Sequence, residues 1–334
     1  GRGWNQEKWG GNYPTASALD GIVPDRPVWL ERVDGHAGWA NSLAMRQAGI
    51  TDEKEDPPGG KIIRDENGFP TEIFIDNAQS AITNVIPSAR ALDRDLALRM
   101  AQDFLLSLGV TSVADMGTSL EDWQTFRRAG DTGKLDIRIM SYASTIEAME
   151  LIAGVGPTAW LYEDRLRLNG IKLVLDGALG SRGALLKSEY NDDPGNQGLA
   201  LLDPTELRNL MSRAAMDRFQ TAVHAIGDNA NEEVLNAIID LSETYSGDRR
   251  WRIEHAQILD PRDIRKFQTG GIIASMQPLH QTSDRLMAEA RLGENRLAGA
   301  YAWNSVTQNN AKLVFGSDAP VEIPNPFEGI AVAI

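Results

Sequence analysis

From residue 92 onward, strand-like apolar segments alternate with helix-like segments, and this alternation constrains the fold more than any other feature. The segments with the length and composition of buried strands are 110–117, 136–144, 171–177, 220–228, 251–257, 271–277 and 312–318. Strands joined by helical crossovers pair in parallel, because a parallel connection needs about a dozen residues or more. Seven such strands are one short of a closed barrel. We therefore predict an α/β fold, a (β/α)₈ TIM-type barrel that lacks its first strand.

The helices of this region carry start and face signals. The DPTE sequence at 203–206 combines an N-cap aspartate, a proline at the first helical position and a glutamate three residues after the cap. The DPRD sequence at 260–263 repeats the cap and the proline, so another helix is expected to begin there. A helix is also predicted from residue 92, and the apolar residues that share one of its faces are Leu96, Met100, Phe104 and Leu108.

The first 91 residues follow a different pattern and are rich in Trp, Gly and Pro. Residues 28–33 are strand-like, and residues 61–76 predict two short strands around a turn at Asn67-Gly68. A short helix is suggested only at 41–49. We predict that residues 1–91 form an inserted subdomain between the absent first strand and the first barrel helix, and that residues 92–334 contain barrel strands 2–8.

The charge and the cysteine content exclude several classes of function. The formal net charge of −14 argues against a nucleic-acid-binding protein, which needs a basic surface, and against electrostatic attachment to anionic lipid. No apolar run reaches the roughly 18–20 residues that span a bilayer. The chain has no cysteine, so disulfides, cysteine-ligated zinc and a thiol nucleophile are excluded. We expect neither nucleic acid nor membrane as a partner, and we expect a cytoplasmic location.

Four polar residues lie in or just after predicted strands, near the carboxyl ends where a barrel of this kind carries its function. His224 closes TAVH, His255 closes RIEH and Asp318 closes VFGSD, while Lys172 lies inside a strand just before the turn DGALGSRG. Each has an ordinary structural explanation, since a strand-end histidine is often only hydrogen-bonded and Asp318 could cap the next helix. Together, two histidines, an aspartate and a lysine in a buried strand on one rim indicate a divalent-metal site.

Sequence motifs along nearly the whole chain resemble the amidohydrolase superfamily, and specifically the amidohydrolase-3 branch that includes YtcJ-like proteins and N-substituted formamide deformylases. The stretches that carry the resemblance are RPVWLERVDGHAGWANSLAMRQAGIT, DPPGGKIIRDENGFPTEIFIDNA, IKLVLDGALGSRGA, NDDPGNQGL, AVHAIGDNAN, RIEHAQIL, ASMQPLHQTSD and FGSDAPVEIPNP. The resemblance implies a metal-dependent hydrolase that cleaves a C–N bond of an amide or formamide through a metal-activated water. Esters or cyclic amides are alternative substrates for the same site.

The resemblance also implies a role for each residue on the rim. The family's lysine on the fourth strand, here Lys172, reacts with CO₂ to give a carbamate that can bridge two metal ions. His224 and His255 would hold one metal with the carbamate, and Asp318 would be both a ligand and the general base. Zinc is the expected ion, as one or two per site. The alternative for Lys172 is an ordinary ion pair with a neighbour such as Asp176.

The chain departs from the family at its first strand, which should end in a His-x-His pair that holds the other metal. No such pair exists in this sequence, and the family's small β-sandwich is also missing. We therefore interpret the chain as an internal segment of a longer enzyme. The alternative is a non-catalytic or degenerate amidohydrolase-like binding protein without the first-strand ligands. The expected partner is a small amide-type substrate, with a homodimer as one assembly open to the protein.

Further polar residues are candidates for substrate binding, and they are His36, Arg182, His280 and Asp284. His36 equally suits a structural role in the insertion, and Arg182 could instead pair with Asp176 or Asp228. The tryptophans that could either wall an apolar pocket or form the core of the insertion are Trp4, Trp9, Trp29 and Trp39.

Overall fold

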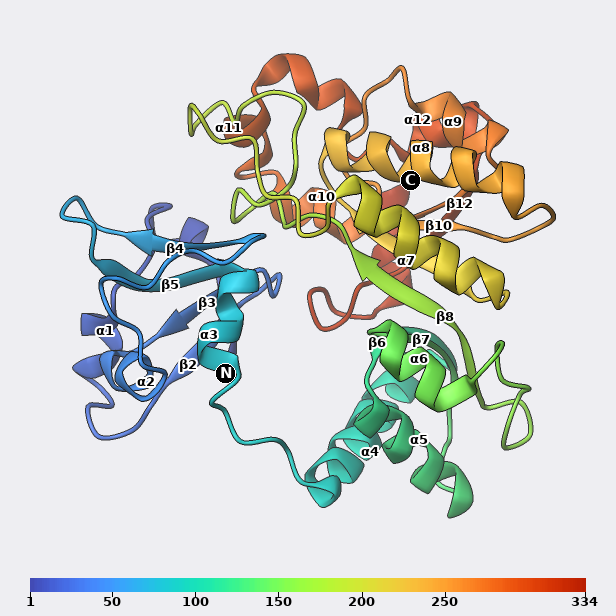
Figure 1. Ribbon diagram of the computed structural model, residues 1–334, viewed down its shortest axis with the longest axis horizontal. Helices are drawn as coiled ribbons and strands as arrows, with labels where there is room; N and C mark the ends of the chain where they lie inside the picture. Colours follow the sequence, from blue (N-terminus) through green and yellow to red (C-terminus); the bar gives the residue numbers. More distant parts are fainter. The chain divides into compact units, whose positions relative to one another are not determined.

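The computed structural model describes residues 1–334, which form two compact units (Figure 1). Unit 1 comprises Gly1–Pro87, Asp176–Leu202 and Ser283–Leu297. Unit 2 comprises Ser88–Leu175, Asp203–Thr282 and Ala298–Ile334. Two segments that are distant in sequence, 176–202 and 283–297, therefore pack with the N-terminal region.

Unit 2 is built on a parallel sheet with the strand order β12-β11-β10-β9-β8-β7-β6. Its strands are β6 (Ser112–Thr118), β7 (Arg138–Ala143), β8 (Leu166–Val174), β9 (Gln220–Ala225), β10 (Arg252–His255), β11 (Ile273–Met276) and β12 (Lys312–Phe315). All seven predicted strands are present and pair in parallel with their neighbours in the sequence, as the alternating pattern predicted. The main difference is β8, which begins at Leu166 rather than at residue 171. The missing first strand remains a prediction.

Helices pack along this sheet, and α7 and α8 lie side by side (Figure 1). The helices with residues in unit 2 are α4 (Ala91–Ser107), α5 (Leu120–Asp131), α6 (Ile146–Ala153), α7 (Pro204–Met216), α8 (Asp228–Thr244), α9 (Ile264–Thr269), α10 (Pro278–Asp284), the 3₁₀ helix η3 (Glu294–Gly299), α12 (Trp303–Gln308) and α13 (Pro326–Ala333). No helix has both the length and the hydropathy that a membrane span requires.

The predicted helix start at Asp203 is confirmed, whereas the one at Asp260 is wrong. The Asp203 carboxylate accepts hydrogen bonds from the backbone N–H groups of Thr205 and Glu206, so α7 begins directly after it. The Asp260 carboxylate instead accepts the backbone N–H of Arg262 within a turn, and α9 begins only at Ile264. An aspartate side chain can close a turn as readily as it caps a helix, and the sequence pattern is similar for both.

Helix α4 presents its apolar face to solvent. Leu96, Met100 and Phe104 are 49%, 64% and 51% exposed, although they share one face as predicted. The helix is held to α5 by polar contacts, with Arg94 Nη1 2.6 Å from Asp122 Oδ1 and Arg128 of α5 paired with Asp95. The hydrophobic pattern thus identified the helix but not what covers it.

Unit 1 contains a second sheet with the order β1-β2-β3-β5-β4. Its strands are β1 (Arg2–Trp4), β2 (Trp29–Arg32), β3 (Ala37–Ala40), β4 (Gly60–Arg64) and β5 (Pro70–Asp76), and β1 and β2 alone are parallel. Short helices accompany them, namely η1 (Gln6–Trp9), α1 (Ala16–Asp20), α2 (Ser42–Gln47), η2 (Asn77–Gln79), α3 (Ser80–Thr83) and α11 (Ala288–Leu292). The predicted turn between β4 and β5 is present, with Gly68 at a φ of 87° that favours glycine.

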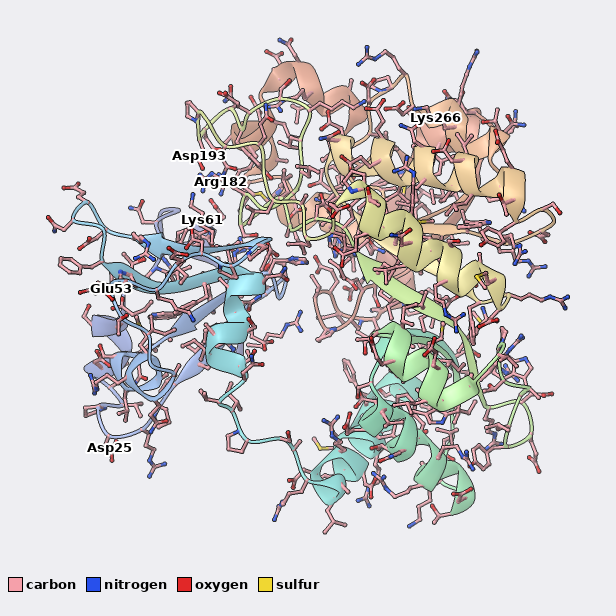
Figure 2. The ribbon with its side chains drawn as sticks, viewed as in Figure 1. Asp25, Glu53, Lys61, Arg182, Asp193 and Lys266 are labelled. Atoms are coloured by element: carbon pink, nitrogen blue, oxygen red, sulfur yellow. The ribbon has the colours of Figure 1, made fainter.

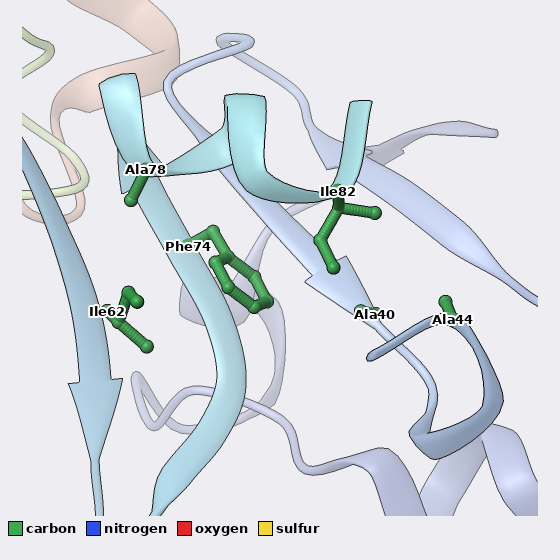
Figure 3. Close-up of a cluster of buried hydrophobic side chains, with 6 residues drawn as sticks. All are labelled: Ala40, Ala44, Ile62, Phe74, Ala78 and Ile82. Carbon is green, nitrogen blue, oxygen red and sulfur yellow. The ribbon is translucent and has the colours of Figure 1, made fainter. Parts of the chain in front are cut away.

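Two apolar clusters stabilise this sheet. One contains Phe74 together with small and branched side chains from β3, β4, α2, η2 and α3 (Figure 3). The other includes Trp4 and Trp39, whose rings meet edge to face at 6.3 Å. Trp29 lies so close to β3 that a Cβ at Gly38 would come within 1.8 Å of its ring. These three tryptophans therefore belong to the core of the subdomain.

Candidate metal centre

The ends of β9 and β10 bring two histidines together in unit 2. Sheet register pairs His224 of β9 with Glu254 of β10, so these two side chains lie on the same face of the sheet. His255 follows Glu254 directly, and regular alternation would turn its side chain to the opposite face. The ring centroids of His224 and His255 are nevertheless only 4.5 Å apart. The chain must therefore leave regular strand geometry at this point.

The backbone at His255 departs from strand geometry in this way. His255 has a φ of 76° and Ala256 a φ of 43°, both in the left-handed region that non-glycine residues rarely adopt. Such strained conformations persist only where the surrounding structure holds them, and they are common at functional sites. The strain here coincides with the approach of His255 to His224, with both residues buried at 7% and 3% exposure.

Asn231 in α8 holds the turns that follow both histidine-bearing strands. Its side-chain amide lies within hydrogen-bonding distance of the backbone carbonyl oxygens of residues 225–227 and of Ile258. The residue is 1% exposed. Sequence reasoning missed Asn231, although it lies in the AVHAIGDNAN motif, since nothing in a single sequence separates an asparagine that organises loops from one on a surface.

Lys172 lies in β8, two residues before the position that pairs with His224. It pairs in register with Ala222, while Val174 pairs with His224. Within its unit, Lys172 makes no hydrogen bond and no ion pair. Burial lowers the pKa of its ammonium, and the charges of Glu254 and Asp318 counter that effect only in part. Its neutral amine is therefore more accessible than that of a solvent-exposed lysine.

Glu254 and Asp318 are the acidic groups whose charges act on Lys172. Both oxygens of the buried Glu254 carboxylate are bound by Arg252, at 2.7 and 3.2 Å. Glu254 is visible in the RIEH motif, but sequence analysis did not select it. Asp318 follows β12, has a φ of 55° and is exposed. It is the second predicted ligand with a left-handed backbone.

His280 in α10 lies beside His255, with ring centroids 6.0 Å apart and the planes inclined by 20°. A small cavity borders both histidines, and its other lining residues are Gln257, Met276, Gln277, Tyr301 and Trp303. The Nδ1 atom of His255 is 2.9 Å from Oε1 of Gln277. Five of the predicted site residues, Lys172, His224, His255, His280 and Asp318, therefore belong to unit 2.

The donor chemistry of these residues suits a divalent cation, since imidazole and carboxylate ligands bind zinc. In the structure as it stands, no three His, Asp or Glu side chains converge in ligand geometry. The imidazoles of His224 and His255 are adjacent. Lys172 could act as a third ligand only if its amine were modified to a carboxylate-like group. The residues fit a metal as a set of donors, with the third ligand still to be supplied.

The predicted site residues of unit 1 have firm local partners. His36 follows β2, and its Nδ1 is 2.6 Å from Oδ1 of the buried Asp76. Burial alone would lower the pKa of His36, but its hydrogen bond to Asp76 and the charges of Asp76, Asp34 and Asp176 raise it overall. Asp76 in turn rests against Gly177 and Gly183, where any Cβ would come within 2.4 Å of its Oδ2.

Arg182, on the loop after β8 (Figure 2), pairs with Asp192 at 2.9 Å. This ion pair involves neither Asp176 nor Asp228, the partners that the sequence suggested. Asp192 also binds Arg291, so one carboxylate connects two arginines from separate segments. Asp284 ends α10 and is partly exposed.

The family model of the amidohydrolase family matches residues 1–334. The chain belongs to this family. Its similarity to Bacillus subtilis "Putative amidohydrolase YtcJ", 34% identical over 343 residues, places it in the amidohydrolase-3 branch. "Protein LONG AFTER FAR-RED 3" of Arabidopsis thaliana is 38% identical over 351 residues. "N-substituted formamide deformylase" of Arthrobacter pascens is 27% identical over 278 residues, covering 78% of this chain and 49% of that protein.

Among solved structures, an uncharacterized metal-dependent hydrolase from Pyrococcus horikoshii OT3 superposes on this amidohydrolase with a TM-score of 0.78 at 28% identity. The match covers 100% of this chain and 65% of that chain. The curated relatives are also longer: all of this chain aligns with 59% of the Arabidopsis protein and 63% of YtcJ. The chain thus spans about three fifths of the length of these two relatives.

Proposed function

We propose that the protein containing this chain is a metal-dependent hydrolase that cleaves the C–N bond of small amides or formamides. Membership of the amidohydrolase family and the likeness to a metal-dependent hydrolase support a hydrolase. The formamide deformylase among the relatives supports a C–N bond as its target. The observation that carries the proposal is Lys172, a lysine without a partner beside two adjacent strand-end histidines.

Lys172 can supply the missing ligand by reacting with CO₂. The neutral Nζ attacks the carbon of CO₂, an N–C bond forms, and one proton leaves to solvent, which gives a carbamate anion. The side chain, which as an ammonium cannot bind a cation, thereby becomes carboxylate-like. His224, His255, the carbamate and Asp318 would then hold the metal, with zinc as the preferred ion.

A divalent cation, when bound, would polarise the substrate carbonyl and lower the pKa of the attacking water. The Asp318 carboxylate would accept the proton of that water at one oxygen and return it to the leaving nitrogen. Its position after β12, free of any side-chain hydrogen bond to the protein, leaves both oxygens available for this exchange. Substrate contacts by His36, Arg182, His280 and Asp284 remain predictions, as does the identity of the partner.

Metal analysis of the full-length protein tests the proposal. We expect at least one divalent ion per chain and loss of that ion in the His224→Ala, His255→Ala double variant. A screen of N-formyl and N-acyl amines should find a substrate, and Asp318→Asn should lower kcat by at least about 10²-fold, the usual scale of acid–base catalysis. Asp240→Asn, an exposed position on α8, is the matched control.

Two results would contradict this function. Stoichiometric metal retained in the double histidine variant would refute the ligand assignment. Absence of bound metal in the full-length protein, together with absence of turnover, would favour the non-catalytic binding protein, which is consistent with the lack of three converged ligands.

A further inference from the structure

The side chain of Gln277 contacts the Nδ1 nitrogen of His255. It directly follows β11, the strand that pairs with β10, and it is 7% exposed. Its Oε1 lies 2.9 Å from Nδ1 of His255, which is itself 7% exposed. The contact is therefore a buried hydrogen bond between two side chains, and its direction depends on how the amide of Gln277 is turned.

The backbone of β11 settles that orientation. The amide Nε2 of Gln277 donates a hydrogen bond to the carbonyl oxygen of Ser275, at 3.3 Å. A backbone carbonyl can only accept, so the NH₂ group must face Ser275 and the carbonyl oxygen of the amide must face His255. The reverse orientation would place two acceptor oxygens against each other at Ser275.

The orientation of Gln277 then determines the tautomer of His255. Because Oε1 can only accept, Nδ1 of His255 must carry the hydrogen. In the neutral imidazole, Nε2 then keeps the lone pair. The order of donation is thus His255 Nδ1 to Gln277 Oε1, and Gln277 Nε2 to Ser275 O.

We propose that Gln277 is a positioning residue that presents Nε2 of His255 as the metal-binding atom. This inference rests on the proposed function, in which His255 is a ligand. A ligating histidine commonly donates its other ring N–H to a second group, which sets its orientation and tautomer. Gln277 performs that role here with an uncharged acceptor held in place by the strand next to His255.

The decisive experiment separates the tautomer from metal binding. In metal-free, full-length protein labelled with ¹⁵N-histidine, long-range ¹H–¹⁵N spectra should show His255 protonated at Nδ1 at a pH where the ring is neutral. The His255 signals are assigned by their loss in His255→Asn. In Gln277→Met the side chain keeps a similar length but has no acceptor, so the preference for Nδ1–H should disappear.

Zinc affinity, measured by competition with a chelator, gives the second readout. Gln277→Met should lower the affinity by about 10–100-fold, the usual effect of removing such a partner. Gln277→Glu should retain the Nδ1–H tautomer and most of the affinity, because a carboxylate oxygen accepts from the same nitrogen. Gln268→Met, the same change on the exposed side of α9, should alter neither readout.

The outcomes separate this inference from the proposed function. Protonation of His255 at Nε2 in the unmodified protein, or an unchanged tautomer in Gln277→Met, would overturn the role of Gln277 even if metal binds normally. Nδ1–H in the unmodified protein that is lost in Gln277→Met would support that role. Failure of the unmodified protein to bind zinc would then count only against the metal-dependent function.

Discussion

The buried arginines of unit 1 and the partly buried Lys172 of unit 2 are held in opposite ways. In unit 1, Arg32 and Arg291 are 2% and 4% exposed, and each is surrounded by acceptors. Arg32 pairs with Asp34 and donates to Gln6 Oε1 at 2.8 Å, while Arg291 pairs with Asp192 and with Glu7 at 2.6 Å. In unit 2, Lys172 has no such partner.

The difference follows from the chemistry of the two cations. A guanidinium does not lose its proton in proteins, so a buried arginine must be paired. A lysine can become neutral, and burial lowers the pKa of Lys172 toward that state. The arginines of unit 1 therefore contribute to structure, whereas Lys172 has no ion pair that requires its charge.

His36 lies between these extremes. It is partly exposed, its Nδ1 bonds Asp76, and its raised pKa favours the charged ring. It is paired like the arginines but can change its charge near neutral pH, as they cannot.

Replacing Lys172 should have the largest effect. Lys172→Met in the full-length protein should remove both metal and turnover, while the free energy of unfolding of the metal-free protein should stay level or rise, since no ion pair is lost. Metal content, turnover and denaturant unfolding check this. Lys61→Met, at an exposed position on β4 (Figure 2), is the control and should change none of them.

An ordinary ion pair at Lys172, such as the alternative with Asp176, would give a different pattern. Its loss would destabilise the fold by about 3–5 kcal/mol. Short carboxylic acids could not restore activity in that case, whereas with a carbamate they should restore part of both metal and turnover.

Replacing Arg291 should have a moderate effect, and on stability rather than chemistry. Arg291→Met leaves Asp192 and Glu7 without their shared cation, and because both are partly solvated we expect a loss of about 2–3 kcal/mol, below that of a fully buried pair. Denaturant unfolding measures it. Arg262→Met removes an exposed pair with Asp260 and should cost much less than Arg291→Met, so equal losses in both variants would undermine the comparison.

Removing the charge of Asp76 should have the smallest effect, visible as a change in pH dependence. Because the folded protein holds the His36 proton more tightly than the unfolded chain, this stabilisation is complete below about pH 6.5 and is lost as the pH rises through the raised pKa. Burial also raises the pKa of Asp76. Its contribution to the free energy of unfolding therefore also falls as the pH rises, but at lower pH than that of His36.

In Asp76→Asn the His36 proton is held less tightly, so the fall in stability above pH 6.5 should flatten. Unfolding free energies at a series of pH values check this. A slope identical in the parent and in Asp76→Asn would show that the pair does not couple protonation to folding.

Much of the parallel sheet and of the candidate ligand set was predictable from the sequence. The strand that contains Lys172 and the helix start at Asp203 were predictable because residues adjacent in sequence specify both. The β4–β5 pairing was readable for the same reason, from a turn and two short strands. The start of α9 was not, because Asp260 and Arg262 form a turn that competes with the cap.

The sequence by itself determined which chemistry is available: two strand-end histidines, a lysine inside an apolar strand, an aspartate after the last strand, and no thiol. Only the tertiary structure decided how these groups are used. The approach of His255 to His224 and the contact of His255 with Gln277 both depend on residues from different strands. Periodicity reports which face of a strand a residue occupies, whereas a pairing across strands is set by packing that no local pattern encodes.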